Sequence, residues 1–249
     1  ANNSGCVLCL SKGQYIFENN YFTKASQNNN CGTAIAYQGE DSNPKEENIV
    51  IDGNTFDCIC GNGNGRCISA IIREGKLTVL NRNFFQNCPQ GSYLIKIKEI
   101  TGIDEFHLIN CIFTNNTAND NYGGGASIWI EKVDLYDPLN FIFQGCEFKN
   151  NYSKIGGGAI QIGPDIYQIF IEVQIIECIF QNNTSLEGCG AVTIQTIYPL
   201  EITACAFINN KSQSGCGAIY INNQQMPRAT ITDCEFRGNS GEKAHCIYI

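Results

Sequence analysis

The feature that most constrains this chain is a short motif that recurs along its length. In each copy a phenylalanine follows a cysteine by two residues, and asparagine, small residues and an alternating apolar tail come next. These copies begin at Cys111, Cys146, Cys178, Cys205 and Cys234. A recurring unit of this kind indicates a repeat architecture, in which each unit packs against its neighbours.

The repeat reaches the start of the chain when the phenylalanine is taken as its anchor. Eight anchors follow one another at intervals of 27 to 35 residues: Phe22, Phe56, Phe85, Phe113, Phe148, Phe180, Phe207 and Phe236. Two residues before the anchors, asparagine gives way to cysteine after the third unit: Asn20, Asn54, Asn83, Cys111, Cys146, Cys178, Cys205 and Cys234. An apolar residue stands five positions before every anchor, so all eight units share one template.

The alternation within each unit predicts short strands with one buried face. A unit offers three such strands, each too short to be stable alone, and the irregular intervals place insertions at the corners. We therefore expect an all-β, single-stranded, right-handed parallel β-helix of about eight three-strand coils, spanning residues 1–249 as one domain with residues 1–20 as an N-terminal cap or first coil. At a strand spacing of ~4.8 Å the rod would be about 40 Å long.

The template also predicts which side chains line the interior. The phenylalanine column, the cysteine and asparagine column and the apolar strand positions should point inward. The run from Gly156 to Gly158 should form a tight corner, where a Cβ would hinder the close approach of coils. An asparagine two residues after the anchor should form an internal amide ladder: Asn87, Asn115, Asn150, Asn182 and Asn209.

The charge balance argues against two classes of partner. The net charge is −8, and the few lysines and arginines are scattered, so no nucleic-acid surface is expected. No apolar stretch is long and uncharged enough to span a membrane. No signal peptide is visible, so Ala1 is interpreted as a processed or trimmed start.

Fifteen cysteines indicate disulfides and an oxidising compartment, because no zinc-type spacing accompanies them. Three units carry a second cysteine at the glycine corner, which favours bonds within coils. The expected pairs are Cys178–Cys189, Cys205–Cys216 and Cys234–Cys246, with Cys111–Cys146 as a pair between coils. Bonds that run along the axis are the alternative, and the odd total leaves at least one thiol free or paired with another chain.

Six glycosylation sequons support a secretory route. Because the first asparagine of each pair is assigned to the ladder, the second is expected to carry the glycan. These acceptors are Asn151, Asn183 and Asn210, and further possible acceptors are Asn2, Asn115 and Asn182. Glycans on neighbouring coils would lie ~5 Å apart, so partial or alternating occupancy is expected.

The tetrapeptides GGAS, GGAI, CGAV and CGAI alternate with FTNN, FKNN, FQNN and FINN. This pattern resembles the GGA[I/L/V] and FxxN repeats of the chlamydial polymorphic membrane proteins and related secreted β-helix proteins, including those of protists. The resemblance is strong from Cys111 onward and weak from Asn2 to Gln90. It implies a cell-surface adhesin or structural rod. The corner cysteines and clustered sequons depart from the bacterial pattern and suggest a eukaryotic secretory version.

An enzyme of the pectate-lyase-like β-helix class, a lyase or hydrolase acting on polysaccharides, is the alternative function. Such enzymes need clustered carboxylates, but Glu147 and Glu235 are three coils apart in the template, and Glu177 and Asp233 are separated by Ala204. We name no catalytic residue, no metal ligand and no cofactor. The acidic segments 39–48 and 131–138 are interpreted as solvated corners, with weak calcium binding as an alternative. The outward aromatics of the AIYI-type strands, Trp129, Tyr220 and Tyr248, are expected to lie on non-adjacent coils.

The leading expectation is an extracellular or cell-surface rod, disulfide-stapled, N-glycosylated and structural or adhesive in role. A soluble ligand-binding module is a third possibility. The chain stops directly after the apolar segment that ends at Ile249, where a β-helix would need a cap. The expected partners are therefore further β-helix of the same chain or a second copy in a head-to-tail filament, together with a cell-surface or glycan receptor.

Overall fold

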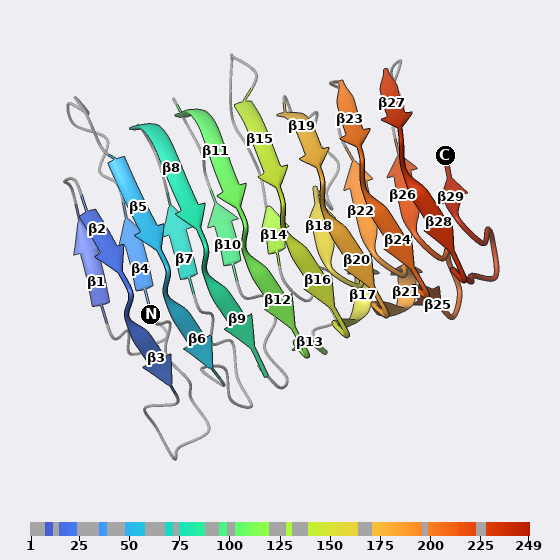
Figure 1. Cartoon of the computed structure of the whole chain (residues 1–249), viewed down its shortest axis with the longest axis horizontal. Helices are drawn as coiled ribbons and strands as arrows, with labels where there is room; N and C mark the ends of the chain where they lie inside the picture. The colour runs from blue at the N-terminus through green and yellow to red at the C-terminus, as the bar shows by residue number, and fades with distance from the viewer. Residues whose placement is uncertain are drawn as a thin grey trace.

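The computed structural model describes residues 8–11, 15–23, 35–38, 48–57, 68–71, 75–87, 95–98, 103–119, 128–130, 139–163, 171–195, 199–222 and 228–249. Within these ranges all regular structure is β-strand, and strands of successive coils pair in parallel. Figure 1 shows the coils following one another along the long axis, from the N-terminal strands at one end to the C-terminal strands at the other. The predicted all-β parallel β-helix is confirmed.

Four sheets run along the rod. The first sheet contains β1 (Leu8–Ser11), β4 (Ile35–Gln38), β7 (Ile68–Ile71), β10 (Ile95–Lys98), β14 (Ile128–Ile130), β18 (Ile160–Ile162), β22 (Val192–Gln195), β26 (Ile219–Asn222) and β29 (Ile247–Tyr248). The second contains β2 (Tyr15–Glu18), β5 (Asn48–Asp52), β8 (Gly75–Asn81), β11 (Ile103–Ile109), β15 (Leu139–Gln144), β19 (Ile171–Ile176), β23 (Leu200–Thr203) and β27 (Ala229–Thr232).

The third sheet carries the anchors in β3 (Tyr21–Thr23), β6 (Thr55–Asp57), β9 (Phe84–Gln86), β12 (Ile112–Thr114), β16 (Glu147–Lys149), β20 (Ile179–Gln181), β24 (Ala206–Ile208) and β28 (Glu235–Arg237). A fourth sheet contains β13 (Thr117–Ala118), β17 (Tyr152–Gly157), β21 (Thr184–Cys189) and β25 (Lys211–Ser212). The three-strand coil of the prediction is therefore incomplete, because the coils that contain β13, β17, β21 and β25 add a fourth strand.

The phenylalanine anchors form one continuous column inside the rod. Neighbouring rings from Phe22 to Phe236 lie 4.6–5.0 Å apart between centroids and are nearly parallel. The six anchors between the two ends are fully buried. This spacing matches the distance between paired strands, so backbone pairing and ring stacking impose the same axial repeat.

Each coil turns sharply before its anchor strand, and the coils from β9 onward turn sharply after it as well, at residues with a left-handed backbone. The bend between the second and third sheets has φ of 50–64° at Asn19, Gly53, Arg82, Asn110, Gly145, Glu177, Ala204 and Asp233. The bend after the third sheet has φ of 54–65° at Asn87, Asn115, Asn150, Asn182, Asn209 and Gly238. Asparagine and glycine accept this conformation at low cost, which explains their frequency at these positions.

The glycine run forms the expected corner between β17 and β18. A Cβ on Gly157 would collide with the carbonyl oxygen of Ile160, and one on Gly158 would collide with that of Gly190 on the next coil. Ala159 and Ile160 are buried directly after the corner. The absence of side chains is therefore required here by the close approach of backbone to backbone.

Candidate functional site

Two columns of asparagine run side by side after the anchor strands, and the structure reverses their predicted roles. The second asparagine of each pair points into the rod and is almost fully buried; this inner ladder contains Asn116, Asn151, Asn183, Asn210 and Asn239. The first asparagine of each pair is exposed, as at Asn115 and Asn182. The prediction that the first column forms the internal ladder is wrong, because its left-handed backbone interrupts the in–out alternation of the strand.

The inner ladder satisfies buried polar groups of the corner through repeated bonds. The Asn183 side-chain oxygen accepts hydrogen bonds from both the backbone and the side-chain nitrogen of Asn151, at 3.1 and 2.9 Å. The Asn183 side-chain nitrogen donates to the carbonyl of Phe148 at 2.9 Å and to the side-chain oxygen of Asn210 at 3.0 Å. The same pattern joins Asn116 to Asn151 and Asn210 to Asn239. The inner ladder is therefore structural, since buried polar groups need such partners.

The exposed column forms a second ladder along the surface. We call Asp57, Asn87, Asn115, Asn150 and Asn182 the outer ladder. Each asparagine side-chain nitrogen donates to the side-chain oxygen of the preceding coil at 3.2–3.3 Å. At its N-terminal end, the hydroxyl of Tyr21 donates to Asp57 at 2.9 Å, and this bond holds the pKa of the Asp57 carboxyl below its usual value.

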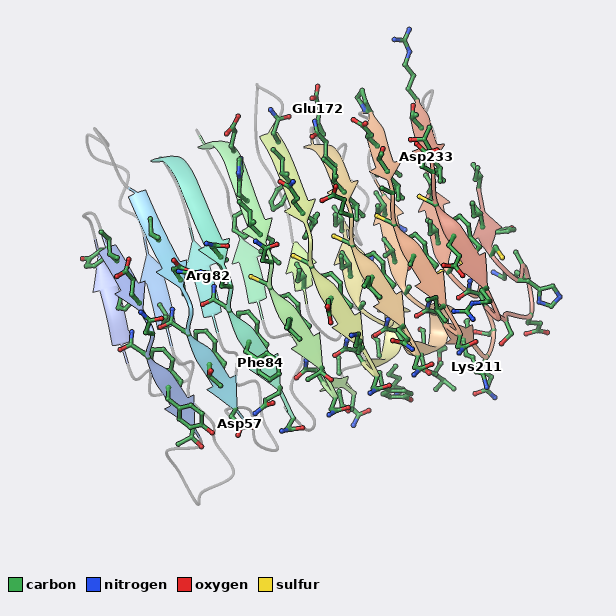
Figure 2. All side chains as sticks on the ribbon, viewed as in Figure 1. Asp57, Arg82, Phe84, Glu172, Lys211 and Asp233 are labelled. Carbon is green, nitrogen blue, oxygen red and sulfur yellow. The ribbon has the colours of Figure 1, made fainter. Side chains whose placement is uncertain are left out.

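The outer ladder ends beside a surface hollow at the C-terminal part of the rod. Asn182, Thr184, Asn209, Lys211 and Gly238 line this hollow, whose volume is about 470 Å³. Gly238 stacks on Asn209 and has the same left-handed backbone, and a Cβ on Gly238 would collide with the side-chain oxygen of Asn209, which covers this position. Figure 2 shows Asp57 and Lys211 along the same lower margin of the rod, near opposite ends. We call this margin, from the outer ladder to the hollow, the polar edge.

The reversal of the two columns changes the predicted glycosylation sites. Asn151, Asn183 and Asn210 are 1, 0 and 0% exposed, and their side-chain nitrogens bond inside the rod. A glycan on these amides is incompatible with this fold, so the assignment of these three as the acceptors is wrong. Asn115 and Asn182 are exposed. Asn2 lies outside the described residues.

The cysteines before the anchors form a thiol column that continues an asparagine ladder. Asn54 and Asn83 donate their side-chain nitrogens to carbonyl oxygens of the coil before them, at 2.9 and 2.6 Å. Cys111 replaces that donor with its thiol, which lies 3.4 Å from the carbonyl oxygens of Leu80 and Ile109. The thiols of the later coils make the same pair of contacts: Cys146, Cys178, Cys205 and Cys234. Cysteine therefore stands in for asparagine as a buried donor.

The eight cysteines whose side chains the structure describes are free thiols, and their neighbours lie along the axis. The Cys146 thiol is within hydrogen-bonding contact of the thiols of Cys111 and Cys178. These contacts, together with burial, raise the pKa of Cys146. Cys189 stacks on Cys216 in a separate column, and burial raises the pKa of its thiol. The predicted pairs Cys178–Cys189 and Cys205–Cys216 would each join two of these columns within one coil; all four thiols are free in the structure, and these pairs stay predictions.

The third predicted pair, Cys234–Cys246, loses its analogy with the other corner cysteines. Ala244, not Cys246, pairs with Cys216, and the carbonyl of Cys246 accepts hydrogen bonds from the backbone of Ala218 and Ile219. The last coil is therefore shifted by two residues relative to the aligned corner cysteines; both thiols are free in the structure, and Cys234–Cys246 stays a prediction. Cys111 and Cys146 are axial neighbours in the thiol column, so their pairing stays a prediction.

The acidic side chains considered for catalysis do not cluster in the described structure. Glu147 lies 2.5 Å from the Lys149 ammonium group, and the Glu235 carboxylate lies 3.0 Å from the Arg237 guanidinium. Glu177 and Asp233 lie at exposed bends, with the bend of Ala204 between them. Among the described residues, no group of three or more histidine, cysteine, aspartate or glutamate side chains could hold a metal ion.

Two aromatic side chains lie closer together than predicted. Tyr220 and Tyr248 are on adjacent coils, and their rings stack with centroids 5.5 Å apart. The ammonium group of Lys243 lies 5.7 Å from the centre of the Tyr248 ring. The expectation that these aromatics lie on non-adjacent coils is therefore wrong for this pair. Segment 131–138 and all but Asn48 of segment 39–48 lie outside the described residues.

Comparison with known proteins adds no assignment. No family model, curated protein or solved structure matches the chain. In the part of the chain that the structure describes, no helix is long and apolar enough to cross a membrane. The polar edge and the inner columns are therefore interpreted from their own geometry.

Proposed function

We propose that this chain is an extracellular rod with a structural or adhesive role. The observation that carries the proposal is the continuity of the interior: one phenylalanine column runs through all eight units. Amide and thiol columns accompany it along the axis. Such uninterrupted stacking suits a stiff rod, which can present a binding surface or act as a spacer. The resemblance of the GGAI and FxxN repeats to surface β-helix proteins favours the same role.

The ends of the rod support stacking on further coils as the mode of assembly. Phe17 and Phe22 in the first coil, and Phe236 and Ile247 in the last, are only partly buried against the core. A coil with phenylalanine at the same position would complete these columns and pair the outer strands. We propose that such coils come from the same polypeptide or from a second copy placed head to tail, with the polar edge left free for a cell-surface or glycan receptor.

Labelling of intact cells tests the proposed location. Lysines on the rod surface, including the exposed Lys211, should react with a membrane-impermeant amine reagent added to intact source cells or to their medium. A cytosolic protein from the same cells serves as the control and should stay unlabelled. If the chain is labelled only after the membrane is permeabilised, the proposed extracellular role is wrong.

A further inference from the structure

The five sequons within the described residues fall into two classes of accessibility. Asn151, Asn183 and Asn210 hold the inner ladder together and are at most 1% exposed. Asn115 and Asn182 are exposed on the outer ladder, and each is followed two residues later by a threonine. A glycan needs its asparagine side chain at the surface of the folded protein. The fold therefore separates compatible from incompatible acceptors among sequons that look alike in the sequence.

The bonding of the two exposed amides is compatible with a glycan. The side-chain nitrogens of Asn115 and Asn182 donate one hydrogen bond each, to Asn87 at 3.3 Å and to Asn150 at 3.2 Å. Glycosyl transfer forms a bond from this nitrogen to the anomeric carbon of a lipid-diphosphate-linked oligosaccharide. The bond from that carbon to the diphosphate breaks, and one amide proton leaves to solvent. The second amide hydrogen remains, so the bond within the ladder can persist.

The spacing of the two acceptors avoids the crowding expected on neighbouring coils. Asn150 lies between Asn115 and Asn182 in the outer ladder and is followed by Asn151 and Tyr152, which do not make a sequon. The two glycans would therefore be two coils apart, or about 10 Å along the axis. Occupancy on alternating coils follows from the sequence without any need for partial modification.

The hollow beside Asn182 offers a place for the first sugars of its glycan. Thr184, Asn209 and Lys211 surround it with hydroxyl, amide and ammonium groups, and Gly238 completes its lining. Such groups can hydrogen-bond sugar hydroxyls. We propose that Asn115 and Asn182 are the glycan-bearing asparagines of the described chain, and that the first sugars on Asn182 lie in this hollow. This inference rests on the proposed secretory route.

Site-resolved mapping of the whole chain, secreted from eukaryotic cells with an added signal sequence, tests the acceptors. Folded, protease-resistant protein should carry glycans at Asn115 and Asn182 and none at Asn151, Asn183 or Asn210. In an Asn2→Gln background, Asn115→Gln and Asn182→Gln should each remove one glycan, and the double variant should remove both. A glycan at any inner asparagine in folded protein, or unmodified Asn115 and Asn182, would overturn the assignment. If native protein is intracellular while the secreted protein carries both glycans, the proposed location fails and the site assignment stands.

The rate of enzymatic deglycosylation of folded protein tests whether the first sugars on Asn182 lie in the hollow. Sugars that lie in the hollow should be released from Asn182 several-fold more slowly than from Asn115. Gly238→Asn adds a side chain beside the hollow at a left-handed position that asparagine accepts, and its Cβ displaces the Asn209 side-chain oxygen from its place in the lining, so it should narrow this difference. Equal release rates at the two sites, unchanged by Gly238→Asn, would show that the sugars on Asn182 do not lie in the hollow.

Discussion

Replacement of Asn183 by alanine should cost far more stability than the replacement of its neighbour Asn182. Asn183→Ala removes both side-chain bonds to Asn151 and the bonds that Asn183 donates to Phe148 and Asn210. The backbone nitrogen of Asn151 and the carbonyl of Phe148 then lose these partners in a buried site. At about 1–3 kcal/mol for each orphaned group, the expected loss in free energy of unfolding is about 2–6 kcal/mol.

Asn182→Gly is the matched control, because it removes an amide from the next position of the same turn. Asn182 is exposed and has φ of 55°, a conformation that glycine adopts without strain. Its ladder bond to Asn150 is made in contact with water. The expected loss for Asn182→Gly is therefore below about 1 kcal/mol.

Urea denaturation of unglycosylated protein from a bacterial host provides the assay. The midpoint should fall strongly for Asn183→Ala and little for Asn182→Gly, with a similar slope for the two variants and the parent protein. Equal losses for the two variants, or a larger loss for Asn182→Gly, would show that the inner and outer ladders have been assigned the wrong way round.

Three further predictions concern the interior columns. Phe148→Ala or Phe180→Ala should lower the free energy of unfolding by about 3–5 kcal/mol, since both rings are fully buried, and a loss below about 1 kcal/mol in denaturant melts would contradict the column. Cys111→Asn should be tolerated better than Cys111→Val in the same melts, because asparagine restores a donor to the Leu80 and Ile109 carbonyls and valine does not; the opposite order would refute the role of the thiol as a donor. Gly158→Ala should cost about 1–3 kcal/mol, because its Cβ would collide with the Gly190 carbonyl, and an unchanged melting temperature would show that the corner has room.

The interior columns could be predicted from the sequence, because residues of the same type stack on one another in successive coils. The phenylalanine repeat predicted a buried column, and each anchor lies over the anchor of the coil before it. Strand alternation within a unit was reliable wherever the backbone stayed extended. The fourth sheet was not predicted, because β13 (Thr117–Ala118) and β25 (Lys211–Ser212) have two residues each, and the longer β17 and β21 run into the glycine corner, which was interpreted as a turn.

The error in the asparagine columns has a simple physical origin. Counting in twos from the anchor places the first asparagine inward, but a left-handed residue turns the chain and moves the next side chain inside. One unit contained the signal. After Phe236, Gly238 replaces the first asparagine of the pair, whereas the second asparagine is retained as Asn239. Asparagine and glycine are interchangeable at a left-handed position, but glycine cannot build an amide ladder. The inner column could therefore have been identified from that unit.

The sequence alone does not decide which cysteines form disulfides, because cysteine plays a second role here. The change from Asn83 to Cys111 in one column looks like a change from a hydrogen-bonding amide to a disulfide-forming thiol. Both side chains, however, donate to a backbone carbonyl of the preceding coil. The presence of two cysteines in some coils and one in others does not show whether a cysteine is a hydrogen-bond donor or part of a disulfide. The register of the last coil, where Ala244 lies over Cys216, depends on insertions that the template does not count.

Hydrogen exchange of the asparagine side-chain amides tests most directly which column lies inside the rod, on which the ladders, the polar edge and the glycan sites all depend. Protein with ¹⁵N-labelled asparagine side chains can be followed by NMR after transfer to heavy water. The side-chain amides of Asn151, Asn183 and Asn210 should exchange slowly, because they are buried and bonded to neighbouring coils. Those of Asn115, Asn150 and Asn182 should exchange rapidly at the surface. Slow exchange of the second group together with rapid exchange of the first would contradict the account.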